Sequence, residues 1–176
     1  MPIEIERKYL VQDANVVAGL GGDRIVQGYA VKERGHMSVR VRIFEDREAA
    51  FLTLKSPLQG LRRDEYEYPI PIDDARVMLT NHCNHRIVRK TRYQVFAHGQ
   101  CFEIDVFDGV HRGLVIAELE LRDEHQRVVR PHWLGEEVSD DRRYGNFSLA
   151  LQERAHLLAV QGCSDGPGTR AGEFAA

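Results

Sequence analysis

The sequence predicts an α+β domain that is mainly β: an eight-stranded antiparallel β-barrel with a few helices packed outside it. Eight segments alternate apolar and polar residues, which is the period of a strand with two different faces. Few segments carry helix signals, and many strands with few helices favour a barrel or a strongly curled sheet. The chain has 176 residues, enough for one domain with a substantial core. We expect this domain to span residues 1–160 and residues 161–176 to form a disordered tail.

Strand and turn signals follow one another along the chain. The eight predicted strands are residues 1–11, 24–31, 38–45, 50–56, 62–69, 86–96, 100–107 and 114–121. Residues 12–22 form a short, helical connection between the first two. Residues 57–61 form a loop, and His98-Gly99 and Asp108-Gly109 are turn signals of the hairpin kind.

Two longer segments predict helices. Asp73 and Asp74 precede Ala-Arg-Val-Met-Leu and predict the start of a helix of about ten residues. Residues 146–160 predict a second helix, and we expect its Phe147, Leu149 and Leu151 to cover the outer wall of the barrel. Residues 131–133, which lie before this helix, predict a loop.

Composition excludes several classes of protein. The net charge of −3 comes from 24 basic and 27 acidic residues, which argues against binding nucleic acid through bulk charge. No apolar run approaches the roughly 20 residues of a membrane-spanning helix. Glu4 and Glu6 stand where a signal peptide would be basic and then apolar, so we expect a cytoplasmic protein. Cys83, Cys101 and Cys163 are widely spaced and odd in number, which predicts free thiols.

The first strand carries an unusual set of charges. Side chains alternate faces along a strand, so Glu4, Glu6 and Lys8 point the same way. Two carboxylates about 7 Å apart on one face repel each other unless a cation lies between them. Lys8 adds a donor for an anion. This strand therefore predicts a site for a divalent metal together with a negatively charged ligand.

The other strands repeat this pattern with a spacing of two. The charged residues on these faces are Arg40, Arg42, Lys55, Glu65, Glu67, Lys90, Arg92, Glu103, Asp105, Glu118 and Glu120. One reading is a sheet with a solvated charged face. The repetition favours a second reading, in which the charged face closes inward as a wet tunnel that requires a charged ligand. Basic walls would hold phosphate oxygens, and acidic groups would hold a hard divalent cation.

Residues 4–8, Glu-Ile-Glu-Arg-Lys, resemble the N-terminal ExExK signature of the CYTH superfamily, the triphosphate tunnel metalloenzymes. The resemblance covers about residues 2–152, in the expected order. The further motifs are Gln27-Gly28-Tyr29, Val39-Arg40-Val41-Arg42, Leu52-Thr53-Leu54-Lys55, Glu65-Tyr66-Glu67, Lys90-Thr91-Arg92-Tyr93, Phe102-Glu103-Ile104-Asp105, Ala117-Glu118-Leu119-Glu120, Trp133-Leu134-Gly135-Glu136-Glu137-Val138 and Arg143-Tyr144-Gly145-Asn146. The chain is most similar to the compact bacterial inorganic triphosphatases.

The resemblance implies a role for each inward residue. Metal-site carboxylates would be Glu4, Glu6, Glu118 and Glu120, and the metal Mg²⁺ or Mn²⁺. Phosphate-binding residues would be Lys8, Arg40, Arg42, Lys55, Lys90 and Arg92. A second metal, or orientation of water and the basic residues, would involve Glu65, Glu67, Glu103 and Asp105. Lys8 and Tyr29 are the candidates for activating the attacking water.

The resemblance further implies hydrolysis of the terminal phosphate of inorganic triphosphate, with nucleoside triphosphates as further substrates. Class IV adenylate cyclase and thiamine triphosphatase share the tunnel and stay open as alternatives. So does a non-catalytic module that binds polyphosphate or nucleotide. We expect a small-molecule triphosphate as the partner, with no nucleic acid and no membrane, and a homodimer is one option. Lysine and tyrosine act as bases only when deprotonated, so we expect an alkaline pH optimum.

Overall fold

The computed structural model describes residues 3–31 and 36–164 of the chain. Within these residues the chain forms nine strands and two α-helices, joined by loops and four short 3-10 helices. The strands are β1 (Ile3–Val11), β2 (Asp23–Val31), β3 (Ser38–Phe44), β4 (Ala49–Lys55), β5 (Arg62–Ile70), β6 (Ile87–Ala97), β7 (Gln100–Phe107), β8 (Val115–Glu120) and β9 (Leu134–Glu137). The helices are α1 (Ile72–Asn81), α2 (Asn146–Ser164), η1 (Ala14–Val17), η2 (Glu45–Arg47), η3 (Gly109–His111) and η4 (Arg142–Tyr144).

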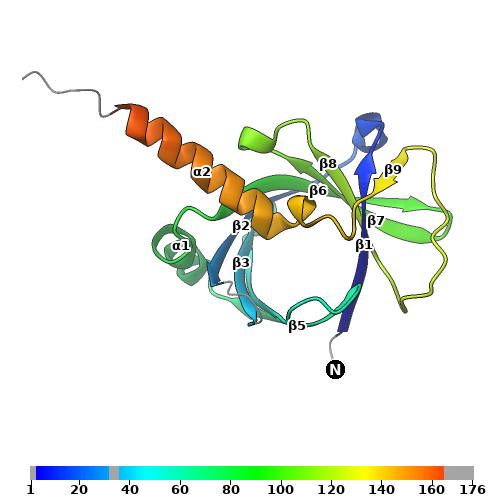
Figure 1. Cartoon of the computed structure of the whole chain (residues 1–176), viewed down its shortest axis with the longest axis horizontal. Coiled ribbons are helices and arrows are strands. Elements are labelled where there is room, and N and C mark those ends of the chain that lie inside the picture. The colour runs from blue at the N-terminus through cyan, green and yellow to red at the C-terminus, as the bar shows by residue number, and fades with distance from the viewer. Residues whose placement is uncertain (1–2, 32–35, 165–176) are drawn as a thin grey trace, which may run out of the picture.

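The first eight strands close into an antiparallel barrel, as predicted. Their order is β5-β4-β3-β2-β6-β7-β8-β1, and β1 pairs again with β5 to complete the ring (Figure 1). The closing seam is short: Ile3, Glu4 and Ile5 pair with residues 62–64 of β5. On its other edge β1 pairs with β8 through residues 6–10. Strand β1 is therefore the element that closes the barrel.

The ninth strand, β9, was not predicted. It follows the predicted loop at residues 131–133 and pairs with β1 at Tyr9 and Val11, beyond the seam with β5. Gly135 permits this pairing, because a Cβ at that position would lie 2.8 Å from the backbone oxygen of Leu10. Its four residues, Leu-Gly-Glu-Glu, do not alternate apolar and polar side chains, so the sequence carries no strand signal there.

Apolar side chains cover the outside of the barrel on two sides. Outward residues of β1, β7 and β8, including Tyr9 and Phe102, pack with Trp133, which precedes β9, and with Leu134, its first residue. The rings of Phe102 and Trp133 meet edge to face, with centroids 5.1 Å apart. On another side α1 packs against β3 and β4 through Ala75. These two cores lie outside the barrel, while a third apolar cluster lies on its inner face at one end.

Helix α2 lies elsewhere than we expected. Its first turns cover one end of the barrel instead of the outer wall, as its course over the ring of strands in Figure 1 also shows. Buried Leu149 packs with Tyr29 and Ile116, which point inward from β2 and β8. Leu151, by contrast, is exposed. The helix extends to Ser164, and the rest of the predicted tail lies outside the described residues.

None of the helices within residues 3–31 and 36–164 is long and apolar enough to cross a membrane.

Candidate active site inside the barrel

The strand register turns every predicted site residue toward the barrel interior. Residues directly opposite each other in an antiparallel pair share a face, so one inward residue fixes the orientation of its neighbours. Opposite pairs include Lys8 with Glu118, Glu6 with Glu120, Tyr29 with Arg40, Lys55 with Glu65, and Arg92 with Asp105. The predicted inward charged face is therefore present in the fold.

The deepest charges lie on β6, β7 and β8. Lys90 is 1% exposed and forms an ion pair with Asp105, which is fully buried. Arg92 donates from Nη2 to Asp105 at 2.7 Å and to Glu118 at 2.6 Å. Burial and the neighbouring Arg92 lower the pKa of Lys90 to about 8. Burial raises the pKa of Asp105, but Arg92 and Lys90 outweigh it and hold the pKa below its usual value.

A second group of ion pairs lies on β3, β4 and β5. Arg40 donates from Nη2 to Glu65 at 3.2 Å and to Glu67 at 3.1 Å. Lys55 contacts Glu65 at 2.8 Å and Glu4 at 2.9 Å, which connects this group to β1. The pKa of Lys55 is lowered, mainly by burial and next by Arg40. Most of the predicted phosphate-binding residues are thus paired with acids.

Arg42 is the exception. Its side chain is nine-tenths buried, yet among the described residues it forms no ion pair, and its Nε has no hydrogen-bond partner. Its guanidinium carbon lies 5.7 Å from the centroid of the Phe44 ring. Burial, with Arg40 and Arg92 nearby, lowers the pKa of Arg42 to about 10. Glu67 and Asp105 raise this pKa, but neither forms an ion pair with Arg42. A buried cation without a close counter-ion is costly, so an anion bound here would be stabilising.

The predicted metal ligands lie together on β1 and β8, but not as a ready-made metal site. No three acidic, histidine or cysteine side chains converge closely enough for that within the part of the chain described. Instead, Glu4, Glu6 and Glu118 pair with lysines and arginines.

Glu120 has no basic partner among the described residues. Its pKa is raised by burial and then by acidic neighbours, beginning with Glu4. Carboxylate oxygens in a locally negative field are the ligands that a hard divalent cation prefers. The residues therefore fit such a metal, provided that it displaces basic side chains.

The two candidates for activating water lie in different surroundings. Lys8 lies between Glu118 and Glu6, and its Nζ is 3.1 Å from Glu6. Burial lowers the pKa of Lys8, but Glu118 and then Glu6 outweigh it and raise the pKa above its usual value. Tyr29 lies at the end that α2 covers, with its ring 5.3 Å from that of Phe147. Burial raises the pKa of its hydroxyl.

Two further inward residues were missed by the sequence analysis. Arg63, opposite Glu4 at the closing seam, contacts both Glu4 and Glu6. Gln27 is fully buried, and its Nε2 donates to the Tyr29 hydroxyl at 3.3 Å. The spacing of two along a strand could have identified both, because Arg63 stands two residues before Glu65 and Gln27 two before Tyr29.

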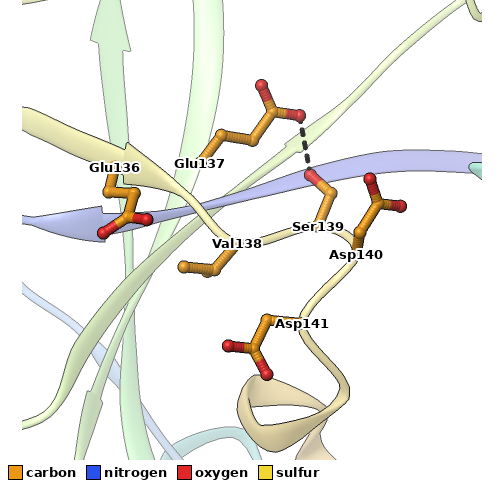
Figure 2. A pocket seen from close by; sticks show the side chains of 6 residues that line it. All are labelled: Glu136, Glu137, Val138, Ser139, Asp140 and Asp141. Atoms are coloured by element: carbon orange, nitrogen blue, oxygen red, sulfur yellow. Dashed lines mark hydrogen bonds between the residues drawn. The ribbon is translucent and has the colours of Figure 1, made fainter.

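An open pocket of about 440 Å³ lies outside the barrel, along residues 136–141 (Figure 2). Figure 2 shows Ser139 donating to the Glu137 carboxylate, at 2.8 Å. The same hydroxyl accepts the backbone N–H of Lys8 at 3.0 Å, and the Val138 N–H donates to the Lys8 carbonyl at 2.8 Å. The segment therefore holds the backbone of Lys8 from outside, while the Lys8 side chain reaches the interior acids.

Comparison with known proteins identifies the family. The model of the CYTH domain matches residues 2–155. An inorganic triphosphatase of Acetivibrio thermocellus is 40% identical over 146 residues, which cover 83% of this chain and 92% of that protein. An inorganic triphosphatase of Nitrosomonas europaea is 40% identical over 152 residues, covering 84% and 97%. A crystal structure of an inorganic triphosphatase superposes with a TM-score of 0.62 and 36% identity, covering 86% of this chain and 96% of that one. The chain therefore belongs to the CYTH family.

Proposed function

We propose that this protein hydrolyses the terminal phosphate of inorganic triphosphate, with Mg²⁺ or Mn²⁺ as the metal. The two inorganic triphosphatases that are 40% identical to it, over nearly their whole length, support this activity. Triphosphatases of the CYTH family are generally metal-dependent. As part of this proposal, we place the reaction in the cytoplasm.

The observation that carries the proposal is the unpaired Arg42. Its neighbour Arg40 is neutralised by Glu65 and Glu67, whereas Arg42 is buried near other cations and forms no ion pair within the part of the chain described. An arginine can hold a phosphate group through two parallel hydrogen bonds. A phosphate oxygen at Arg42 would remove the cost of burying this charge, and a chain of phosphates would extend from there to Lys90 and Arg92.

Glu4, Glu6, Glu118 and Glu120 would hold the metal. When bound, the metal neutralises charge on the phosphate oxygens and on the leaving diphosphate. Glu65, Glu67, Glu103 and Asp105 would orient the basic residues or contribute to a second metal. Each of these four already contacts an arginine or lysine of the interior.

Hydrolysis of a phosphoric anhydride depends mostly on positioning and on charge stabilisation. The basic residues hold the phosphate chain in one orientation and stabilise the charge on the transferred group. The oxygen of a water molecule bonds to the terminal phosphorus, the bond to the bridging oxygen breaks, and diphosphate leaves. A proton of that water passes to a base, for which we propose Tyr29 or Lys8.

Both candidate bases predict a reaction that is faster at alkaline pH. The pKa of each is raised above its ordinary value in the ligand-free barrel, so each becomes a base only at high pH. We expect the turnover rate to increase above pH 7. A rate that peaks near pH 6 and declines above pH 7 would remove both residues from this role.

A substrate panel tests the proposal. Tripolyphosphate, ATP, thiamine triphosphate and longer polyphosphate are compared with Mg²⁺ and with Mn²⁺, while phosphate and cyclic AMP are both measured. We expect fastest phosphate release from tripolyphosphate, lost in Glu4→Gln and Lys8→Ala and kept in Arg24→Gln, which changes an exposed residue outside the barrel. Cyclic AMP from ATP would indicate a cyclase, and tight binding without release a binding module.

A further inference from the structure

Arg63 differs from every other basic residue near the predicted metal ligands. Its Nη2 donates to Glu6 at 2.8 Å, and its Nε donates to Glu4. Its side chain is 18% exposed, and it stands directly opposite Glu4 in the seam between β1 and β5. The guanidinium thus binds the two carboxylates of the first strand together.

The other cations in contact with these two carboxylates each contact a further acid. Lys55 also contacts Glu65, and Lys8 also contacts Glu118. Among the described residues, Arg63 forms ion pairs with Glu4 and Glu6 alone. A metal that takes these two carboxylates would leave Lys55 paired with Glu65 and would deprive Arg63 of both its partners. Lys8 would lose Glu118 as well, because Glu118 is also a proposed metal ligand, but Arg63 is the one of these cations that joins both carboxylates of the first strand.

We propose that Arg63 is an exchangeable counter-cation: it occupies Glu4 and Glu6 while the metal is absent, and it turns to the phosphate chain when the metal binds. The inference rests on the proposed function and its metal site. An arginine stays protonated throughout the ordinary pH range, so the guanidinium keeps its charge when it is released. A buried charge that has lost its partners is costly, and phosphate oxygens nearby are its natural replacement.

Two consequences follow for binding. Arg63 competes with the metal, so the metal binds more weakly to the free protein than it would without Arg63. Arg63 also couples the two ligands, because the metal releases a cation for the phosphates and the phosphates receive that cation. Each ligand therefore strengthens the binding of the other by more than their direct contact would.

Calorimetric titration of Mn²⁺ into metal-free protein tests the competition. We expect Arg63→Gln to bind Mn²⁺ roughly tenfold more tightly than the wild type, since charge-assisted hydrogen bonds to both carboxylates no longer oppose the metal. Arg63→Lys should lie between the two, because an ammonium lacks the fork that reaches two carboxylates. Arg24→Gln removes an arginine that faces two acids outside the barrel and should bind like the wild type. Equal or weaker binding by Arg63→Gln overturns the proposal.

Repeating the titration with saturating methylenediphosphonate, which is not hydrolysed, tests the coupling. We expect this compound to tighten Mn²⁺ binding more in the wild type than in Arg63→Gln, and equal tightening would overturn the coupling.

If Arg63→Gln does not fold, as judged by circular dichroism, Arg63→Lys decides alone: it must bind Mn²⁺ more tightly than the wild type. If the wild type releases phosphate but Arg63→Gln binds Mn²⁺ as the wild type does, this role of Arg63 is refuted while the proposed function stands. No release and no Mn²⁺ binding would refute the proposed function itself.

Discussion

Changing Arg42 to methionine is expected to stabilise the ligand-free protein, although it alters a buried residue of the barrel. Most buried substitutions destabilise a protein. Here the wild-type residue is a buried cation that has no ion pair among the described residues. Methionine is unbranched and uncharged, so it can replace the aliphatic stem of Arg42 without the cost of desolvating a charge.

The magnitude follows from the electrostatics of the site. Burial, together with Arg40 and Arg92, lowers the pKa of Arg42 from 12.5 to about 10. Because one pKa unit corresponds to about 1.4 kcal/mol, the charged form is destabilised by roughly 3 kcal/mol. Loss of the contact with the Phe44 ring offsets about 0.5–1 kcal/mol of the gain. The net gain of about 2 kcal/mol corresponds to an increase in Tm of roughly 4–8 °C for a chain of this size.

The assay is thermal unfolding in EDTA, so that no metal-dependent turnover occurs during the measurement. Arg40→Met is the matched variant, because Arg40 lies on the same face of β3 but is paired with Glu65 and Glu67. We expect Arg40→Met to lower the Tm by leaving these acids unpaired. Saturating tripolyphosphate should then raise the Tm of the wild type well above that of Arg42→Met. Ligand at 100 times its Kd stabilises a protein by about 2.7 kcal/mol.

A lower Tm for Arg42→Met in the absence of anion, similar to that of Arg40→Met, would refute the reasoning. It would mean that Arg42 stabilises the barrel and that its charge is not held for a ligand. An equal response of both proteins to tripolyphosphate would likewise remove Arg42 from the phosphate site.

Three further predictions address the end of the barrel, the metal ligands and the interior charge. Leu149→Ala should lower the free energy of unfolding by about 2–5 kcal/mol in urea titrations, since Leu149 is buried at the end that α2 covers; a loss under about 1 kcal/mol would contradict that packing. Glu120→Gln should increase the Mg²⁺ concentration for half-maximal activity about tenfold or more, and an unchanged value would exclude Glu120 as a ligand. The pKa of Lys90 is lowered to about 8, so Lys90 is mostly neutral at pH 9 and charged at pH 7. Metal-free tripolyphosphate should therefore bind more weakly at pH 9 than at pH 7, and its binding at pH 9 should be accompanied by proton uptake. Calorimetry in two buffers of different ionisation enthalpy measures both the affinity and the proton uptake.

Alternation in the sequence was enough to predict the barrel. A period of two identifies a strand wherever one face is apolar, and charges such as Glu4 and Glu6 mark the opposite face without knowledge of the register. Strand β9 was not predicted, because its four residues do not alternate and because it forms only where Gly135 approaches Leu10. The helix of residues 146–160 was predicted, but its apolar face matches the end of a barrel as well as its side.

The sequence alone could not predict which charged residues of the interior pair with each other. Spacing places Glu118 and Lys8 on inward faces, but only the register sets them opposite each other. Among the described residues Arg42 forms no ion pair while Arg40 forms two, which follows from the positions of Glu65 and Glu67 on β5. The inward orientation of Arg63 was predictable from its spacing to Glu65, whereas its contact with both Glu4 and Glu6 depends on how β1 meets β5.

The interior ion pairs are better explained by ligand exchange than by stability. Buried ion pairs contribute little net stability, because desolvation offsets the attraction, so a barrel kept only for its stability would gain from an apolar interior. Pairs such as Arg92 with Glu118 can instead separate, with the acid turning to a metal and the base to a phosphate. Each group then loses one partner and gains another, and the cost of opening the pair is offset within the complex. Arg42 forms no ion pair among the described residues, so it has none to open, and we expect it to favour the binding of an anion.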